Sequence, residues 1–157
     1  MEYDLKAVSE AAQELEGVPW KWRGWNKSEA IDCLYGAFYL LKKGGVVDST
    51  IGGKTYYRRT EGHLATFSVA SEYIKKILHV EKVEEQEGAI AIFKNGAFAS
   101  HIGIITDQGI AHTMRGQKFT TDPIQKWSRY ILEFYMPTKS GYKTNPRDVR
   151  IPSLRKT

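Results

Sequence analysis

The spacing of apolar residues changes from helical to strand-like near residue 88, and this change limits the folds open to the chain. Three earlier segments repeat apolar residues three or four positions apart, as helices do: 4–16, 34–41 and 68–79. Four later segments are short apolar or alternating runs bounded by turn residues, as antiparallel strands are: 89–93, 99–105, 110–114 and 130–136. Helices followed by an antiparallel sheet predict an α+β domain.

Cys33, the only cysteine, lies in the first turn of the second predicted helix. Asp32 before it is a good N-cap, and Gly44 ends the helix. The partial positive charge at a helix N-terminus favours the thiolate, which is the form that attacks a carbonyl carbon. Free cysteine also serves as a small buried hydrophobic residue, so a catalytic role for Cys33 requires a base nearby.

Two histidines, His101 and His112, fall on neighbouring predicted strands. Antiparallel strands joined by a short turn place the side chains of one face next to each other. If the helix N-terminus packs against that sheet, the thiol of Cys33 meets the imidazole of His101, and His112 holds that imidazole in orientation. This is the thiol–imidazole arrangement of nucleophilic catalysis. The other two histidines, His63 and His79, have no acidic or thiol neighbours in sequence and are taken as surface or cap residues.

The chain has 157 residues, of which 41% are hydrophobic and 12% aromatic, and this is enough for the core of one domain. A single cysteine excludes an internal disulfide and, with four scattered histidines, a cysteine-rich zinc site. A reducing compartment is therefore favoured, and no metal is expected. Residues 1–6 lack the apolar core of a secretory signal, and no segment is long enough to span a membrane, so export by the general secretion route is not expected.

The net charge of +5 is concentrated at the end of the chain. Residues 137–157 hold six basic side chains, one acidic side chain and three of the five prolines. We therefore expect a folded domain over 1–136, followed by an extended basic arm over 137–157 that binds a partner. The domain itself is then neutral. This argues against nucleic-acid binding, because phosphate contacts need basic residues on the folded face.

The loop after the first helix carries three tryptophans within six positions, Trp20, Trp22 and Trp25, between basic residues and glycine. Aromatic and basic residues in this pattern line a groove for sugars or peptides, or stack on nucleobases. Any one of the three can instead anchor the loop to the core. The sequence alone leaves these alternatives open.

Six short pieces of the sequence occur in a defined order: Gly17-Val18-Pro19-Trp20, Gly24, Asp32-Cys33, Gly88-Ala89-Ile90-Ala91-Ile92-Phe93, His101-Ile102-Gly103-Ile104 and His112. In that order the chain resembles the NlpC/P60 family of papain-like cysteine peptidases, over roughly residues 5–136. The resemblance implies a papain-like α+β fold, with the cysteine at the N-terminus of a helix that packs on a central antiparallel sheet. It also implies a triad of Cys33, His101 and His112 that needs no cofactor.

Three positions depart from the family pattern. Trp20 stands where the family has a tyrosine that helps the oxyanion hole, Gly36 lies one position later than usual, and Ala89 replaces an aspartate. The expected nucleophile and base are both retained.

The resemblance implies hydrolysis of an amide bond in the stem peptides of bacterial peptidoglycan, typically the bond between γ-linked D-glutamate and the diamino acid. We expect five residues to contact this substrate: Trp20, Trp22, Trp25, Asp32 and Ser100. Short members of the family without a signal sequence resemble bacteriophage tail peptidases. We therefore expect a protein made in the bacterial cytoplasm and carried to the cell wall in a phage or related particle, with the arm binding tail-tip or hub proteins.

Three alternatives stand beside this interpretation. The CHAP amidases share the order of cysteine and histidine and act on the same polymer. A catalytically weak structural component of a tail assembly would keep the fold and use the arm for docking, although the intact triad argues against it. A nucleic-acid-binding module would use the tryptophan loop and the arm, and the neutral domain argues against that.

Overall fold

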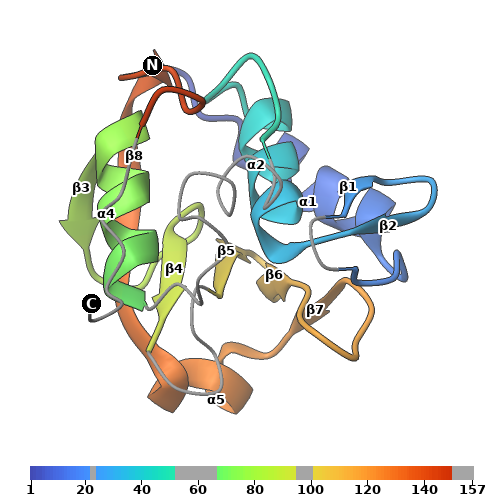
Figure 1. The fold of residues 1–157 in the computed structure, drawn as a ribbon. Coiled ribbons are helices and arrows are strands. Elements are labelled where there is room, and N and C mark those ends of the chain that lie inside the picture. Colours follow the sequence, from blue (N-terminus) through green and yellow to red (C-terminus); the bar gives the residue numbers. More distant parts are fainter. Residues whose placement is uncertain (22–23, 52–66, 95–100, 150–157) are drawn as a thin grey trace, which may run out of the picture.

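The structure, a computed structural model, describes residues 1–21, 24–51, 67–94 and 101–149. A six-stranded antiparallel sheet has the strand order β3-β8-β4-β5-β6-β7 (Figure 1). Its strands are β3 Leu78–Val83, β4 Ile90–Phe93, β5 Ile102–Thr106, β6 Gly109–His112, β7 Thr120–Asp122 and β8 Ile131–Tyr142. The helices are α1 Leu5–Leu15, α2 Cys33–Lys43, α4 Phe67–Ile77, α5 Ile124–Trp127 and the 3-10 turn η1 Ser128–Tyr130. A separate hairpin pairs β1 Trp25–Asn26 with β2 Ala30–Ile31. The predicted α+β class is confirmed.

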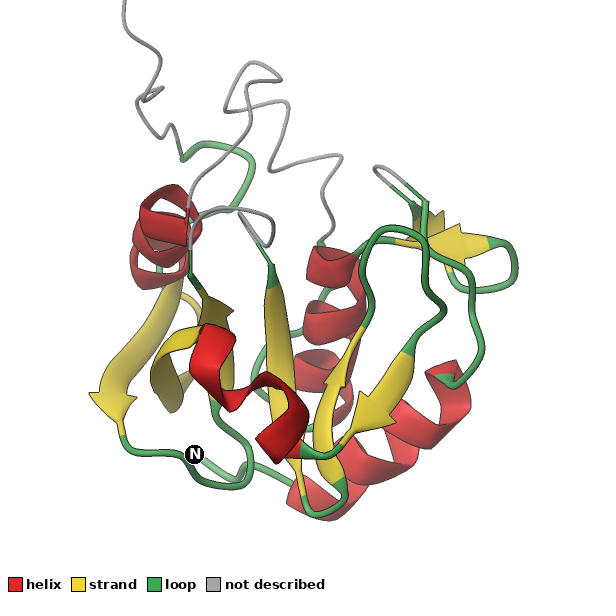
Figure 2. Cartoon of the chain, turned by 90° about the horizontal axis from the view of Figure 1, so that it is seen from below, coloured by secondary structure: helices red, strands yellow, loops and turns green. Residues whose placement is uncertain are grey.

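Helices α1 and α2 cover one face of the sheet, and α5 lies on the other face (Figure 2). The apolar stripe of α2 belongs to one buried cluster with the isoleucines of β4 and β5, which includes these residues: Leu34, Phe38, Leu41, Ile90, Ile92, Ile102 and Ile104. A smaller core lies under α5 and contains Ala91, Phe93, Ile105, Ile110, Trp127 and Ile131. Strand β4 is therefore buried on both faces, which explains why its sequence is a continuous apolar run.

The β1–β2 hairpin leads directly into the start of α2. The Asp32 N–H donates to the carbonyl of Gly24 at 3.0 Å, and the Asp32 side chain accepts the N–H of Tyr35 at 2.7 Å as the N-cap of the helix. An N-cap of this kind stabilises a helix by about 0.5–2 kcal/mol. A Cβ on Gly24 would lie 2.8 Å from the carbonyl oxygen of Ala30, so the hairpin closes only with glycine there. Together these contacts fix the position of Cys33.

The structure corrects the expected end of the domain. Strand β8 runs past residue 136 to Tyr142 and pairs with β3, so the extended arm expected over 137–157 is wrong for residues 137–142. Val149 is also buried in the main core. Pro137 is tolerated within β8 because β4 pairs with this strand only as far as Tyr135, which leaves the following residues unpaired on that side. The rest of the expected arm, 150–157, lies outside the described residues.

Two strands of the six-stranded sheet, β3 and β7, have no counterpart among the predicted elements, and neither do the short strands β1 and β2 of the hairpin. Strand β3 begins at Leu78, directly after α4, so the helix expected to reach residue 79 ends at Ile77. Strand β7 has three residues, and none of them is apolar, so neither an apolar run nor alternation marks it in the sequence.

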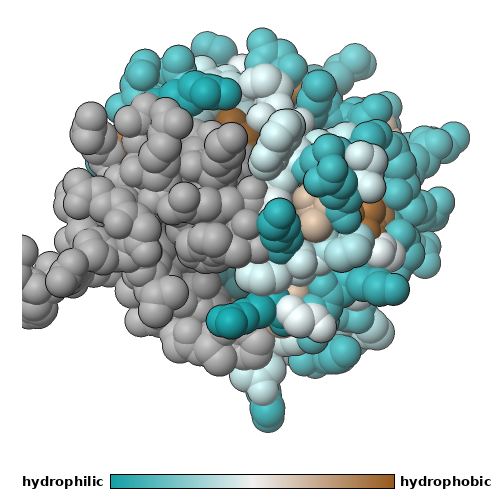
Figure 3. Space-filling view, turned by 45° about the vertical axis from the view of Figure 1, so that its right-hand side comes forward, coloured by the Kyte–Doolittle hydropathy of each residue, from teal (hydrophilic) through white to brown (hydrophobic). Residues whose placement is uncertain are grey.

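The described surface in Figure 3 is largely hydrophilic, with small and separate hydrophobic spots. Three large apolar side chains are well exposed among the described residues: Met1, Trp25 and Leu132. None of the described helices is long and apolar enough to cross a membrane. Most apolar side chains in this part of the chain instead belong to the two cores.

Gly109 holds β7 against the turn between β5 and β6. Its φ is +130°, and a Cβ there would lie 2.1 Å from the carbonyl oxygen of Asp122. We expect Gly109→Ala to lower the free energy of unfolding by more than about 3 kcal/mol, because a strained backbone and a clash act together. Urea unfolding followed by circular dichroism measures this loss.

Gly116→Ala is the matched control, because Gly116 also has a left-handed φ, +81°, but no atom lies within 4 Å of the added Cβ. Gly116→Ala should lower the free energy of unfolding by the cost of the left-handed backbone alone, about 1–2 kcal/mol. Equal losses for the two variants would show that the backbones of Gly109 and Asp122 do not approach closely.

Candidate active site

Two buried histidines meet at the ends of neighbouring strands. His101 directly precedes β5, and His112 is the last residue of β6. Their side chains are almost closed to solvent, and Nε2 of His101 lies 2.8 Å from Nδ1 of His112. The contact between the two imidazoles that the sequence predicts is therefore present.

The hydrogen-bonded chain continues to Asp122, which no sequence motif marks. Its Oδ2 lies 2.9 Å from Nε2 of His112 and accepts the indole N–H of Trp127 at 2.8 Å. Sequence reasoning missed this carboxylate because it missed strand β7. The β-branched pair Thr120 and Thr121 is the one local feature that favours a strand after His112, and two residues are too few to predict one.

Aromatic rings surround the two imidazoles. The ring of Phe93 packs edge-on against His101, with centroids 4.4 Å apart, and stacks over His112 at 6.0 Å. The indole of Trp127 lies 5.2 Å from the ring of His112. These rings place the imidazoles in an apolar environment, where charged forms are disfavoured.

Both histidines are neutral in this environment. Burial, and then the nearby His112, hold the pKa of His101 well below its usual value. Burial also lowers the pKa of His112, although its hydrogen bond to Asp122 acts in the opposite direction. At neutral pH the pair therefore carries no positive charge, which is the state that a general base requires.

Cys33 is half-buried at the start of α2. Burial of the sulfur and the charge of Asp32 raise the pKa of the thiol to about 12, although backbone N–H groups, that of Ile102 first among them, favour the thiolate. The expectation that the helix N-terminus favours the thiolate of Cys33 is therefore wrong, because burial outweighs the favourable N–H groups. The contact with Ile102 brings the sulfur to the residue that directly follows His101.

The residues expected to contact substrate lie at the start of α2 and in the segment before it, where the structure describes them. Asp32 is 3% exposed and caps α2. The backbone N–H of Trp20 donates to the carbonyl of Gln117 at 3.2 Å, and Trp20 bridges to Ile31 of β2. Trp25, on β1, is 58% exposed. Two further expected residues lie outside the described residues: Trp22 and Ser100.

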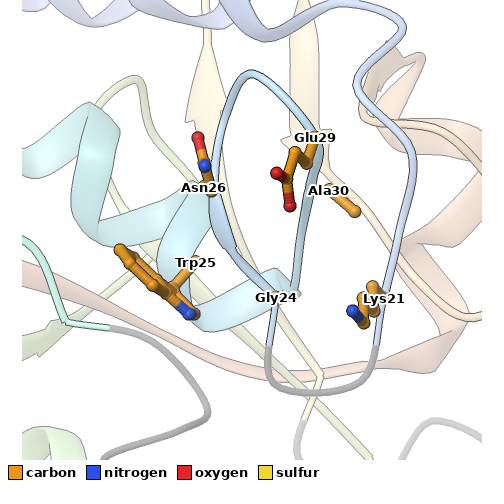
Figure 4. Close-up of a pocket in the computed structure, with 6 residues that line it drawn as sticks. All are labelled: Lys21, Gly24, Trp25, Asn26, Glu29 and Ala30. Carbon is orange, nitrogen blue, oxygen red and sulfur yellow. The ribbon is translucent and has the colours of Figure 1, made fainter.

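A small pocket opens in the hairpin that precedes Cys33. Its volume is about 200 Å³, and Figure 4 shows its lining residues: Lys21, Gly24, Trp25, Asn26, Glu29 and Ala30. Because β2 ends one residue before the N-cap of α2, this pocket lies close in the chain to the thiol. Within the described ranges, no group of three or more His, Cys, Asp or Glu side chains is arranged to hold a metal ion.

No protein-family model matches the sequence, and no curated protein matches it. Solved structures do match. One is a protein described as similar to lipoprotein, of the NLP/P60 family, from Staphylococcus aureus, with a TM-score of 0.57, 15% identity, and coverage of 89% of this chain and 44% of that chain. Another is the NlpC/p60 domain of the peptidoglycan hydrolase SagA, with a TM-score of 0.54, 17% identity, and coverage of 86% of this chain and 99% of that chain.

The chain has the fold of an NlpC/P60 domain. The predicted papain-like α+β fold is therefore confirmed. The chain spans less than half the length of the staphylococcal protein and nearly all of the SagA domain. At this level of identity the likeness concerns the fold, and the chemistry has to be argued from the site itself.

The reactivity of Cys33 should reflect its raised pKa. We expect its alkylation by iodoacetamide to be slow near neutral pH and to keep rising beyond about pH 10, where an ordinary thiol has levelled off, because only the thiolate reacts. Mass spectrometry of the modified protein against pH measures this profile. The urea-unfolded chain is the control, and a plateau in the folded protein near or below pH 8.5 would contradict the raised pKa.

Proposed function

We propose that this protein is a cysteine hydrolase that cleaves an amide bond of bacterial peptidoglycan. Cys33 is the nucleophile, His101 is the base, and His112 orients the base. The observation that carries the proposal is the buried hydrogen bond between the two histidines, one residue away from the Ile102 N–H that contacts the thiol. The NlpC/P60 fold supports it, because one neighbour of that fold, SagA, is described as a peptidoglycan hydrolase.

In the resting site the thiol and the imidazole are both neutral, so the nucleophile is not formed in advance. The proton of Cys33 moves to Nδ1 of His101 as Sγ bonds to the carbonyl carbon of the amide. The resulting imidazolium keeps its Nε2 hydrogen bond to His112. The enzyme therefore creates charge only when substrate is present to complete the reaction.

The oxyanion that forms lies at the N-terminus of α2, which begins at Cys33, and the backbone N–H of Cys33 is its proposed donor. The imidazolium of His101 then gives its proton to the leaving amine, and the C–N bond breaks to leave a thioester on Sγ. Water attacks this thioester with His101 again acting as base. The acid is released, and the thiol is restored.

The family resemblance supports finer proposals about the substrate and the setting. The bond cleaved joins γ-linked D-glutamate to the diamino acid, with Trp20 and Trp25 contacting the stem peptide on the hairpin side of Cys33. The protein belongs to a phage tail or a related particle that meets the cell wall. The basic residues over 150–157 are the segment that would dock to tail-tip or hub proteins.

Substitution of the nucleophile and the base tests the proposed chemistry. We expect Cys33→Ala to abolish cleavage of purified peptidoglycan and His101→Ala to slow it by about 10²–10⁴-fold, because a general base contributes that much. New amino termini, identified by mass spectrometry, measure cleavage. His79→Ala, on β3, is the matched histidine control and should leave the rate unchanged.

The products of that experiment separate the alternatives. New amino termini on the diamino acid support the proposed bond, whereas termini on the first alanine of the stem indicate a CHAP-type amidase. A wild-type protein that cleaves no peptidoglycan from any wall type would support a structural tail component instead.

The pH dependence of kcat/KM should show the depressed pKa of the base. We expect kcat/KM on a soluble stem peptide to stay constant as pH falls through about 6.5, the ordinary pKa of histidine, and to decrease only at lower pH. The reason is that burial, and then His112, keep His101 neutral, and the neutral form is the active one. Circular dichroism at each pH separates this loss from unfolding. A midpoint at or above pH 6.5 would contradict the assignment of His101 as the base.

A further inference from the structure

Asp122 ends a chain of hydrogen bonds that starts at His101. It lies on β7 opposite Ile110 of β6, and its side chain is 14% exposed. One oxygen, Oδ2, faces both Nε2 of His112, at 2.9 Å, and Nε1 of Trp127, at 2.8 Å. The other oxygen, Oδ1, lies 4.0 Å from the exposed ammonium of Lys126. The two oxygens therefore have different surroundings, and Oδ2 is the one that meets the histidine.

The ionisation of Asp122 decides where the proton of His112 sits. Burial raises the pKa of Asp122, but the hydrogen bonds from His112 and Trp127 outweigh this effect and hold it below its usual value. An ionised carboxylate only accepts hydrogen bonds, so Nε2 of His112 carries the proton. Because His112 is neutral, its Nδ1 then has a lone pair and no hydrogen.

The proton position on His112 also determines that on His101. Nε2 of His101 lies 2.8 Å from this unprotonated Nδ1 of His112, so Nε2 of His101 must carry a proton and donate it. His101 is also neutral, and its other nitrogen, Nδ1, keeps the lone pair. We propose that Asp122 is a positioning residue that holds both histidines in the Nε2–H form and so keeps the basic lone pair on Nδ1 of His101.

The proton positions follow from the hydrogen bonds together with the charge states of Asp122 and the two rings, whereas their catalytic consequence rests on the proposed hydrolysis. In that reaction Nδ1 of His101 takes the proton of Cys33. Without the carboxylate, His112 can hold its proton on Nδ1 and donate it to Nε2 of His101. His101 then carries its own proton on Nδ1 and cannot accept a second one while it remains neutral.

Trp127 supports this role of Asp122 from the other side. Its indole N–H donates to the same oxygen as His112, and its ring packs against the imidazole of His112. Two donors on one oxygen fix the rotation of the carboxylate more closely than one. The carboxylate therefore stays aligned with Nε2 of His112.

The test is NMR of the histidine rings in the full-length protein, labelled with ¹⁵N-histidine, near neutral pH. Long-range ¹H–¹⁵N correlation distinguishes protonated from unprotonated ring nitrogens. We expect both His101 and His112 in the Nε2–H form in the wild type. Asp122→Ala should move both rings toward the Nδ1–H form and lower kcat on a soluble stem peptide by about 10²-fold or more, with KM changed by less than about threefold.

Glu133→Ala is the matched control, because Glu133 is a carboxylate of similar exposure, 16%, that accepts hydrogen bonds from Ser71 and Tyr135 away from the histidines. It should change neither the ring protonation nor kcat. The wild-type spectrum decides the matter even if Asp122→Ala does not fold, since an Nδ1–H form of either histidine would overturn the inference. Unchanged rings or unchanged kcat in a folded Asp122→Ala would overturn it as well.

The same data separate this inference from the proposed function. If the wild type shows both Nε2–H rings, and Asp122→Ala shifts them, but the wild type cleaves no peptidoglycan, the proposed substrate fails and the control of ring protonation by Asp122 stands. If the wild type cleaves peptidoglycan while its rings are in the Nδ1–H form, the hydrolysis stands and the role of Asp122 fails.

Discussion

The hydrogen bonds from His101 through His112 to Asp122 are the interaction on which the rest of the site depends. A buried polar group left without a partner costs about 1–3 kcal/mol, so two buried imidazoles require partners in fixed places. The strand order of the sheet places these partners. Strand β6 lies between β5 and β7, so His112 on β6 lies between His101 and Asp122. The glycine at position 109 brings β7 close enough for Asp122 to reach His112.

Burial, more than the helix dipole, sets the charge of the thiol. A helix N-terminus stabilises a negative charge by about 0.3–1 kcal/mol at an exposed site, whereas moving a charge out of water costs several kcal/mol. The sulfur of Cys33 has the dipole and several N–H groups in its favour, and burial still raises its pKa to about 12. A site that holds both a neutral thiol and a neutral imidazole does not bear the desolvation cost of a buried ion pair.

Local patterns predicted the parts of the structure that depend on neighbours in sequence. The cap at Asp32, the apolar stripe of α2 and the strand run at 89–93 need only adjacent residues, and the two histidines are paired by strand order. Asp122 was missed because its strand has three residues and no apolar member, so that two β-branched threonines are its only local signal. Strand β3 and the continuation of β8 through Pro137 depend on each other across the sheet, and local propensity argues against the proline. The pKa of the thiol depends on tertiary burial, which no sequence window contains.

Because β8 continues to Tyr142, some of the basic residues expected on an extended arm belong to the folded domain. Lys139, Lys143 and Arg147 belong to the described domain and lie on or after β8, so part of the basic charge that the sequence assigns to an arm is on the folded surface. In the sheet, β8 and its partner β3 lie at one end, and β6 and β7 lie at the other. The basic residues therefore lie near one end of the sheet, and the hydrogen-bonded side chains of His112 and Asp122 lie at the other.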